Sequence, residues 1–273
     1  MSNLVSTKWL ADHLYTDDLI ILDASWHLPA AKRDAKADFE AAHIAGARFF
    51  ELDRVSDQKT TLPHMLPTAE DFAASMAALG VNSTSRVIVY DTVGLFSAAR
   101  CWWMFKIFGH DNVAVLDGGL KKWQAEGRAT QAETTRPKAG NFKARFRPDM
   151  VKSITQVASG KAQIIDARSP TRFRGEEAEP RANVKPGHMP GAKNVHYATL
   201  LNPDGTLKPQ QELAQIFSNA GIDSEKPIIT SCGSGVTAAI LTLALTELGA
   251  KNHALYDGSW AEWGASEQEI VLG

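Results

Sequence analysis

Residues 228–240 read Ile228-Ile229-Thr230-Ser231-Cys232-Gly233-Ser234-Gly235-Val236-Thr237-Ala238-Ala239-Ile240, which is a β-branched run, a loop with two glycines and a second apolar run. This order predicts a strand at 228–231, a tight turn, and a helix over about 235–248. Cys232 stands at the turn. The first amides of a helix have no intrahelical partner and carry a partial positive charge, so they stabilise a thiolate. Cys232 is therefore the candidate nucleophile.

The segments around this stretch occur twice, about 140 residues apart. Segments 20–24, 43–47, 87–91 and 117–119 have counterparts at 164–168, 188–192, 228–232 and 257–259. Asp91 stands in the first copy where Cys232 stands in the second. Two copies are too few for a solenoid, so the repeat predicts two globular domains, 1–135 and 150–273, joined by a polar connector at 136–149.

Short β-branched runs alternate with helical segments in each copy. The first copy predicts strands at 87–90 and 113–116 around a helix near 97–108, and the second predicts strands at 228–231 and 253–256 around the helix at about 235–248. Such alternation is typical of an α/β fold in which a parallel sheet is flanked by helices. Gly109 and Gly249 follow the two helices and are the expected C-terminal caps.

The composition is that of an ordinary globular protein, with 44% apolar and 22% charged residues. A formal charge of −2 leaves no excess of basic residues for binding nucleic acid or an anionic membrane. No apolar run reaches the length of a membrane span, and no secretory signal pattern opens the chain. The two cysteines, Cys101 and Cys232, are too few for a disulfide scaffold or a cysteine-based zinc site. A reducing, cytoplasmic location is the expectation.

These motifs identify a resemblance. The chain resembles the tandem-domain rhodanese-type sulfurtransferases, and within them the members that use 3-mercaptopyruvate, through the following segments: Asp-Ala-Ser-Trp at 23–26, 43–50, His-Met-Leu-Pro at 64–67, Trp-Trp-Met at 102–104, Asp-Gly-Gly at 117–119, Pro-Gly-His at 186–188, and 232–238. The resemblance implies two rhodanese-like domains, of which the N-terminal one lacks the nucleophile. Thiosulfate-using relatives carry basic residues after the cysteine, whereas Gly233 and Ser234 are neutral, which favours 3-mercaptopyruvate as donor.

The loop after Cys232 has the residues that an anion site needs. Gly233, Gly235, Val236 and Thr237 can turn their main-chain amides toward the sulfur and bind substrate and a persulfide. We expect the thiolate to take the sulfur of 3-mercaptopyruvate, to release pyruvate, and to pass the sulfur to an acceptor thiol, thioredoxin or cyanide. This reaction requires neither a metal nor an organic cofactor. A buried inert thiol is the alternative for Cys232.

The resemblance assigns further site residues. Arg172 and Arg181 match the arginines that bind substrate in the family, and a guanidinium can hold a carboxylate through two hydrogen bonds. The alternative is that they pair only with the glutamates at 176, 177 and 179 on an exposed loop. The resemblance also proposes a proton relay of Ser234, His64 and Asp53, although the serine could be a helix cap and the histidine a structural hydrogen-bonding group.

Three other functions compete with this interpretation. A thiosulfate:cyanide sulfurtransferase would share the fold and the persulfide, and a non-catalytic sulfur carrier or interaction module would share the fold. A cysteine phosphatase would need an arginine where Ala238 stands, and no nucleotide-binding glycine motif is present. His43 and His188 occupy equivalent places in both copies although only one copy has a nucleophile, so we expect them to be structural.

Overall fold

The computed structural model describes residues 2–134 and 136–273, which form two compact units. The first unit comprises Met1–Asp57, Pro67–Phe146 and Asn202–Leu207, and the second comprises Gln58–Leu66, Arg147–Leu201 and Lys208–Gly273. Each unit thus contains one short segment from the opposite half of the chain. The predicted domain boundary at residue 135 lies outside the described residues.

The first unit is built on a five-stranded parallel sheet. In spatial order its strands are β1 (Leu4–Val5), β5 (Val113–Leu116), β4 (Arg86–Tyr90), β2 (Leu19–Asp23) and β3 (Arg48–Phe49). Its helices are α1 (Thr7–His13), α2 (Ala35–Ala41), α3 (Leu52–Val55), α4 (Ala69–Ala78), α5 (Ala98–Ile107) and α6 (Gly119–Ala125), with a 3₁₀ turn η1 (Pro29–Ala31).

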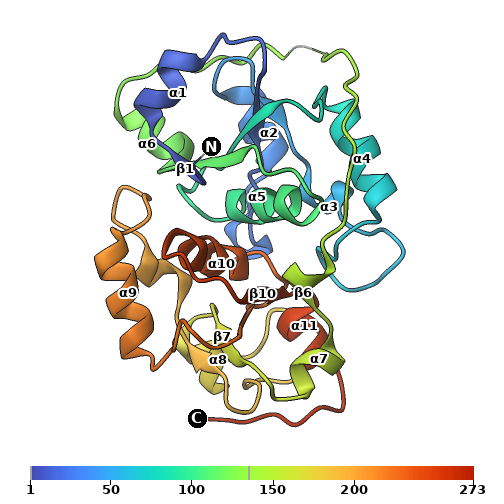
Figure 1. Ribbon diagram of the computed structural model, residues 1–273, viewed down its shortest axis with the longest axis vertical. Coiled ribbons are helices and arrows are strands. Elements are labelled where there is room, and N and C mark those ends of the chain that lie inside the picture. Colours follow the sequence, from blue (N-terminus) through green and yellow to red (C-terminus); the bar gives the residue numbers. More distant parts are fainter. Residues whose placement is uncertain (1, 135) are drawn as a thin grey trace. The chain divides into compact units, whose positions relative to one another are not determined.

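Helices cover both faces of this sheet, as a buried parallel sheet requires. Helix α5 packs on β4 and β5 (Figure 1). The other face forms a core in which alternate strand residues such as Ile88 and Tyr90 meet Leu10 of α1, Phe39 of α2 and Leu120 of α6. The strands are therefore apolar at nearly every position because each side chain is buried on one face or the other.

The second unit repeats this architecture. Its parallel sheet has the order β6 (Val151–Lys152), β10 (His253–Tyr256), β9 (Ile228–Ser231), β7 (Gln163–Asp166) and β8 (Lys193–Asn194), which is the order of the first sheet strand for strand. Its helices are α7 (Ile154–Ala158), α8 (Pro170–Arg174), α9 (Gln210–Asn219), α10 (Ala238–Glu247) and α11 (Ser259–Trp263), with 3₁₀ turns η2 (Pro148–Met150) and η3 (Tyr197–Leu200). Helix α10 packs on β9 and β10 (Figure 1).

The predicted α/β class and the predicted strands are confirmed, with β4 beginning one residue early. Gly109 and Gly249 have left-handed backbone angles, with φ of +84° and +76°, directly after the last turns of α5 and α10, as the capping interpretation requires. One prediction is wrong: α10 begins at Ala238, not near residue 235, because the preceding residues form a loop. None of the helices formed by the described residues is long and apolar enough to cross a membrane.

Candidate active site

Cys232 follows the last residue of β9, a strand with neighbours on both sides in the second sheet. It is a free cysteine, and 2% of it is exposed. Its N–H donates to Ser259 Oγ at 3.2 Å, and the carbonyl oxygens of Cys232 and Gly233 accept the N–H groups of Trp260 and Ala261, both at 2.9 Å. The first turn of α11 thus fixes the start of the loop and turns these two carbonyl groups toward α11.

The rest of the loop curls toward the N-terminus of α10. Gly235 has a φ of +76°, in the left-handed region where a Cβ is strained. Ser234, Gly235 and Val236 are buried, whereas Gly233 and Thr237 are partly exposed. Because α10 begins directly after Thr237, the positive end of its dipole lies at the end of the loop.

His64 and Ser234 lie together in the second unit. His64 Nδ1 is 2.9 Å from Ser234 Oγ, and the two residues are 5% and 6% exposed. His64 has a φ of +60°, which is uncommon for a residue other than glycine and persists only where the surroundings determine it. Two of the three residues of the predicted relay are therefore in hydrogen-bond contact.

Asp53, the third residue of the predicted relay, belongs to α3 of the first unit. Its Oδ2 accepts a hydrogen bond from Trp26 Nε1 at 3.1 Å in that unit. Its part in the relay stays a prediction.

Arg172 and Arg181 both face the residue after the nucleophile. A Cβ built on Gly233 would lie 3.2 Å from Nη2 of Arg172 and 3.8 Å from Nη1 of Arg181. A Cβ at 233 would require the Arg172 guanidinium to shift by a few tenths of an ångström, whereas the Arg181 distance is an ordinary contact. Glycine at this position therefore permits two cations to approach the loop together.

Arg172 is held by a buried chain of charges. Glu179, whose side chain is 3% exposed, accepts hydrogen bonds from Nη2 and Nε of Arg172 and, at 2.8 Å, from Nη1 of Arg168. Arg168 in turn donates to both oxygens of Asp166, at the end of β7, and lies over the Trp260 ring at 4.3 Å. Burial disfavours the charged form of Arg168, but Asp166 and Glu179 outweigh this and raise the pKa of its guanidinium.

Arg172 does pair with Glu179, one of the glutamates that the alternative names, but the carboxylate of Glu179 is buried and not on an exposed loop surface. Arg174 forms an exposed ion pair with Glu176 at 2.6 Å, whereas the partner of Arg172 is buried and is itself anchored to the sheet. Sequence reasoning missed Asp166, Arg168 and Glu179 as parts of this arrangement. The signal was a charged residue two positions after the end of β7, where the first copy has Ser25.

The equivalent loop of the first unit surrounds a carboxylate of the chain itself, that of Asp91. Asp91 follows β4, and its carbonyl oxygen accepts the N–H of Leu120, as that of Cys232 accepts the N–H of Trp260. Its carboxylate accepts four main-chain N–H groups at 2.7–3.0 Å, two on each oxygen, from Val93, Gly94, Phe96 and Ala98. A loop at this place in the repeat can therefore surround a negative group with amides.

Both halves of the chain are similar to known proteins. The model of the rhodanese-like domain matches residues 6–126 and again residues 152–266. The chain belongs to the rhodanese-like sulfurtransferase family. It is 44% identical over 266 residues to the 3-mercaptopyruvate sulfurtransferase of Escherichia coli K12, covering 96% of this chain and 94% of that protein.

Two further relatives of this sulfurtransferase cover nearly the whole chain. It is 43% identical over 296 residues to thiosulfate/3-mercaptopyruvate sulfurtransferase 1, mitochondrial, of Arabidopsis thaliana, covering 98% of this chain and 77% of that one. The crystal structure of SseA from Escherichia coli, described as a 3-mercaptopyruvate sulfotransferase, matches with a TM-score of 0.87 and 42% identity, covering 95% of this chain and 99% of that one.

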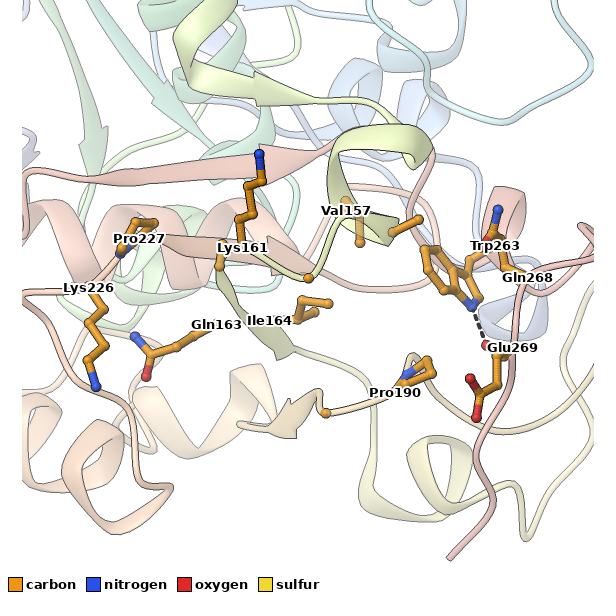
Figure 2. A pocket seen from close by; sticks show the side chains of 14 residues that line it. Val157, Lys161, Gln163, Ile164, Pro190, Lys226, Pro227, Trp263, Gln268 and Glu269 are labelled. Atoms are coloured by element: carbon orange, nitrogen blue, oxygen red, sulfur yellow. Dashed lines mark hydrogen bonds between the residues drawn. The ribbon is translucent and has the colours of Figure 1, made fainter.

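A cavity of about 560 Å³ lies in the second unit of the sulfurtransferase, away from this site (Figure 2). It is lined at the start of β7 by Gln163 and Ile164 and before β9 by Lys226 and Pro227. Because the strands are parallel, this is the opposite edge of the sheet from Cys232. None of the predicted site residues lines it.

The repeated histidines have the same structural contacts in both rhodanese-like units. His43 Nδ1 donates to the Phe39 carbonyl at 2.7 Å and its ring stacks on that phenylalanine at 4.1 Å. His188 Nδ1 donates to the Phe173 carbonyl at 2.9 Å and stacks on it at 3.9 Å. These equivalent contacts are those expected of histidines that support the fold in each unit.

Proposed function

We propose that this sulfurtransferase moves sulfur from 3-mercaptopyruvate to a thiol acceptor or cyanide through a persulfide on Cys232. The observation that carries the proposal is the approach of Arg172 and Arg181 to Gly233, the residue after the nucleophile. 3-Mercaptopyruvate has a carboxylate and a neighbouring ketone at one end and a thiol at the other. Two guanidinium groups beside the loop suit the first end and leave the sulfur directed at Cys232.

The first half-reaction breaks the carbon–sulfur bond of the donor. The Cys232 thiolate attacks the thiol sulfur, a sulfur–sulfur bond forms, and the electron pair of the broken bond goes to the departing carbon as pyruvate enolate. The enolate takes one proton to become pyruvate. Ser234 and His64, 2.9 Å apart, are the proposed route for that proton, with Asp53 as the proposed third member.

The second half-reaction restores the thiolate. An acceptor thiolate or cyanide attacks the outer sulfur of the persulfide, and the bond between the two sulfurs breaks with its electron pair returning to Cys232. Thioredoxin is the proposed protein acceptor, since its exposed thiol can make this attack. Neither half-reaction involves net oxidation by an outside reagent.

The amides of 233–237 are the proposed cradle for the persulfide, together with the N-terminus of α10. Asp91 supports this role because its two carboxylate oxygens occupy the matching loop of the first unit through four N–H groups. The loop from Asp91 to Ala98 is one residue longer than the loop from Cys232 to Ala238. We infer that the cradle was kept in both copies and that an internal carboxylate fills the first.

A comparison of donors tests the substrate. Purified protein is assayed with cyanide as acceptor and with 3-mercaptopyruvate or thiosulfate as donor, and kcat/KM is measured for each. The proposal expects the higher value for 3-mercaptopyruvate, because thiosulfate has no carboxylate for the arginines. A higher value for thiosulfate, a donor that the name of the Arabidopsis relative also includes, would overturn the assignment.

We propose a cytoplasmic location on chemical grounds. Cys101 and Cys232 are both free thiols, and a persulfide-forming cysteine persists best in a reducing compartment. Fractionation of the native host with an antibody to the protein tests this, and enrichment in an organelle or an extracellular fraction would contradict it.

A further inference from the structure

Each unit contains a short segment from the other half of the chain, 58–66 in the second unit and 202–207 in the first. Both segments donate a hydrogen bond to an aspartate, and the two aspartates are equivalent in the repeat. In the second unit, the N–H of Leu66 donates to Asp257 Oδ2 at 2.8 Å. In the first unit, the N–H of Leu207 donates to Asp117 Oδ1 at 2.8 Å. The distance in sequence from Leu66 to Leu207 is nearly the same as that from Asp117 to Asp257. The two hydrogen bonds are therefore equivalent contacts of the repeat, one in each unit.

In the second unit this bond lies next to the candidate catalytic residues. Leu66 is two residues beyond His64, whose left-handed backbone needs support from its surroundings. Asp257 is 4% exposed and directly follows β10, the strand paired with β9, which ends before Cys232. Anchor and nucleophile are thus fixed to neighbouring strands of one sheet.

In the first unit the same bond lies in a copy of the repeat that has Asp91 at the place of Cys232. Segment 202–207 is also tied there by Lys121 Nζ, which donates to the Pro203 carbonyl at 3.0 Å, and by the ion pair of Lys122 with Asp204 at 3.1 Å. The loop it approaches contains Asp91 in place of a nucleophile, and Gly205 packs against Gly94 of that loop. The chain therefore supplies its own matched control.

We propose that Asp257 is a positioning residue for sulfur transfer, acting through the main chain of Leu66 to hold His64 against Ser234. A hydrogen bond from an amide to a buried carboxylate is stronger than one between neutral groups, which suits an anchor for a strained residue. The inference rests on the proposed function, because it assigns Asp257 to the same site.

The test compares Asp257→Ala with Asp117→Ala. Both remove the carboxylate that receives a segment from the other half of the chain, and the loss of stability should be smaller in Asp117→Ala because Lys121 and Lys122 still hold 202–207. Asp257→Ala should lower kcat/KM for 3-mercaptopyruvate about tenfold or more, since small displacements of catalytic groups have large effects on rate. Asp117→Ala should change it less than about twofold, and Asp257→Asn, whose Oδ1 can still accept the bond, should recover most of the loss.

A double-mutant cycle separates positioning from a general loss of structure. In a His64→Asn background, where asparagine tolerates the left-handed backbone, Asp257→Ala should cost little further activity. An equal loss in both backgrounds would show that Asp257 does not act through His64. Equal activities for Asp257→Ala and Asp117→Ala would overturn the inference in the same way.

Hydrogen exchange of the full-length protein provides a readout that needs no turnover. Asp257→Ala should speed exchange in peptides covering 58–66 and leave 202–207 protected. Asp117→Ala should leave 58–66 protected and speed exchange in 202–207 only in part, because Lys121 and Lys122 still hold that segment. Unchanged protection of 58–66 in Asp257→Ala would refute the anchor. If the unmodified protein failed to turn over 3-mercaptopyruvate, the proposed function would be wrong, while the exchange result would still decide the anchoring.

Discussion

At the scale of single residues, two equivalent buried aspartates differ in their partners. Asp166 and Asp23 end equivalent strands, β7 and β2, and both are fully buried. Asp166 is paired with the charged Arg168, whereas Asp23 accepts hydrogen bonds from neutral groups, among them the N–H of Ser25 on Oδ1 at 2.9 Å. Burial, reinforced by the nearby Asp91, raises the pKa of Asp23 to about 6 despite that hydrogen bond.

This pKa makes stability depend on pH. Because the folded state binds the proton of Asp23 more tightly than the unfolded state does, its contribution is complete below about pH 4 and is lost as the pH rises through about 6. Asp23→Asn should remove this decline, which amounts to at most about 3 kcal/mol. Urea unfolding at several pH values measures it, and an unchanged slope between pH 4 and 6 in the variant would contradict the assignment.

The buried carboxylate of Glu179 should matter for the donor. In Glu179→Gln, Arg168 and Arg172 lose their shared anion, so Arg172 is no longer held against Gly233. We expect kcat/KM for 3-mercaptopyruvate to fall about tenfold, mainly through KM. The control is Glu177→Gln, since Glu177 is exposed and accepts hydrogen bonds from the Ser169 and Thr171 hydroxyls. Equal kinetics for the two variants would argue against the clamp.

At the scale of elements, the loops after β4 and β9 show what the sequence could and could not predict. The strands were predictable because their β-branched runs end at polar residues. The ends of the helices were predictable because a glycine follows each of them. The start of α10 was not, because the left-handed backbone at Gly235 follows from how the loop folds on α11 and not from local composition. The bonds from Leu66 to Asp257 and from Leu207 to Asp117 join residues far apart in sequence and have no local pattern.

The loop after β4 depends on a single carboxylate. Asp91→Asn replaces one acceptor oxygen by a donor facing two main-chain N–H groups, so at least two hydrogen bonds to a charged group are lost. We expect a loss of about 2–4 kcal/mol in the free energy of unfolding, with sulfur transfer retained below the unfolding transition. Denaturant titration and a parallel activity assay measure both. A variant as stable as the parent would contradict the internal-anion interpretation.

At the scale of the whole molecule, the two copies of the repeat share one sheet order and differ in the residue after equivalent strands, Asp91 after β4 and Cys232 after β9. The repeat and the parallel sheets were predictable from the sequence because their local patterns occur twice. The position of Cys232 was predictable because it follows one of the repeated strand patterns. The resemblance predicted that His64 and Ser234 act together, but only the fold showed that both belong to the second unit, which contains segment 58–66 of the first copy. The candidate site thus combines residues that a division of the chain into consecutive domains would separate.

The most direct test of the account is a single half-reaction followed by mass spectrometry. The folded protein is mixed with one equivalent of 3-mercaptopyruvate and no acceptor, and both the intact mass and released pyruvate are measured, with Cys232→Ser as control. We expect one added sulfur atom on Cys232, one pyruvate released per chain, and neither in the control. A folded protein that gains no sulfur, or a control that gains as much, would contradict it.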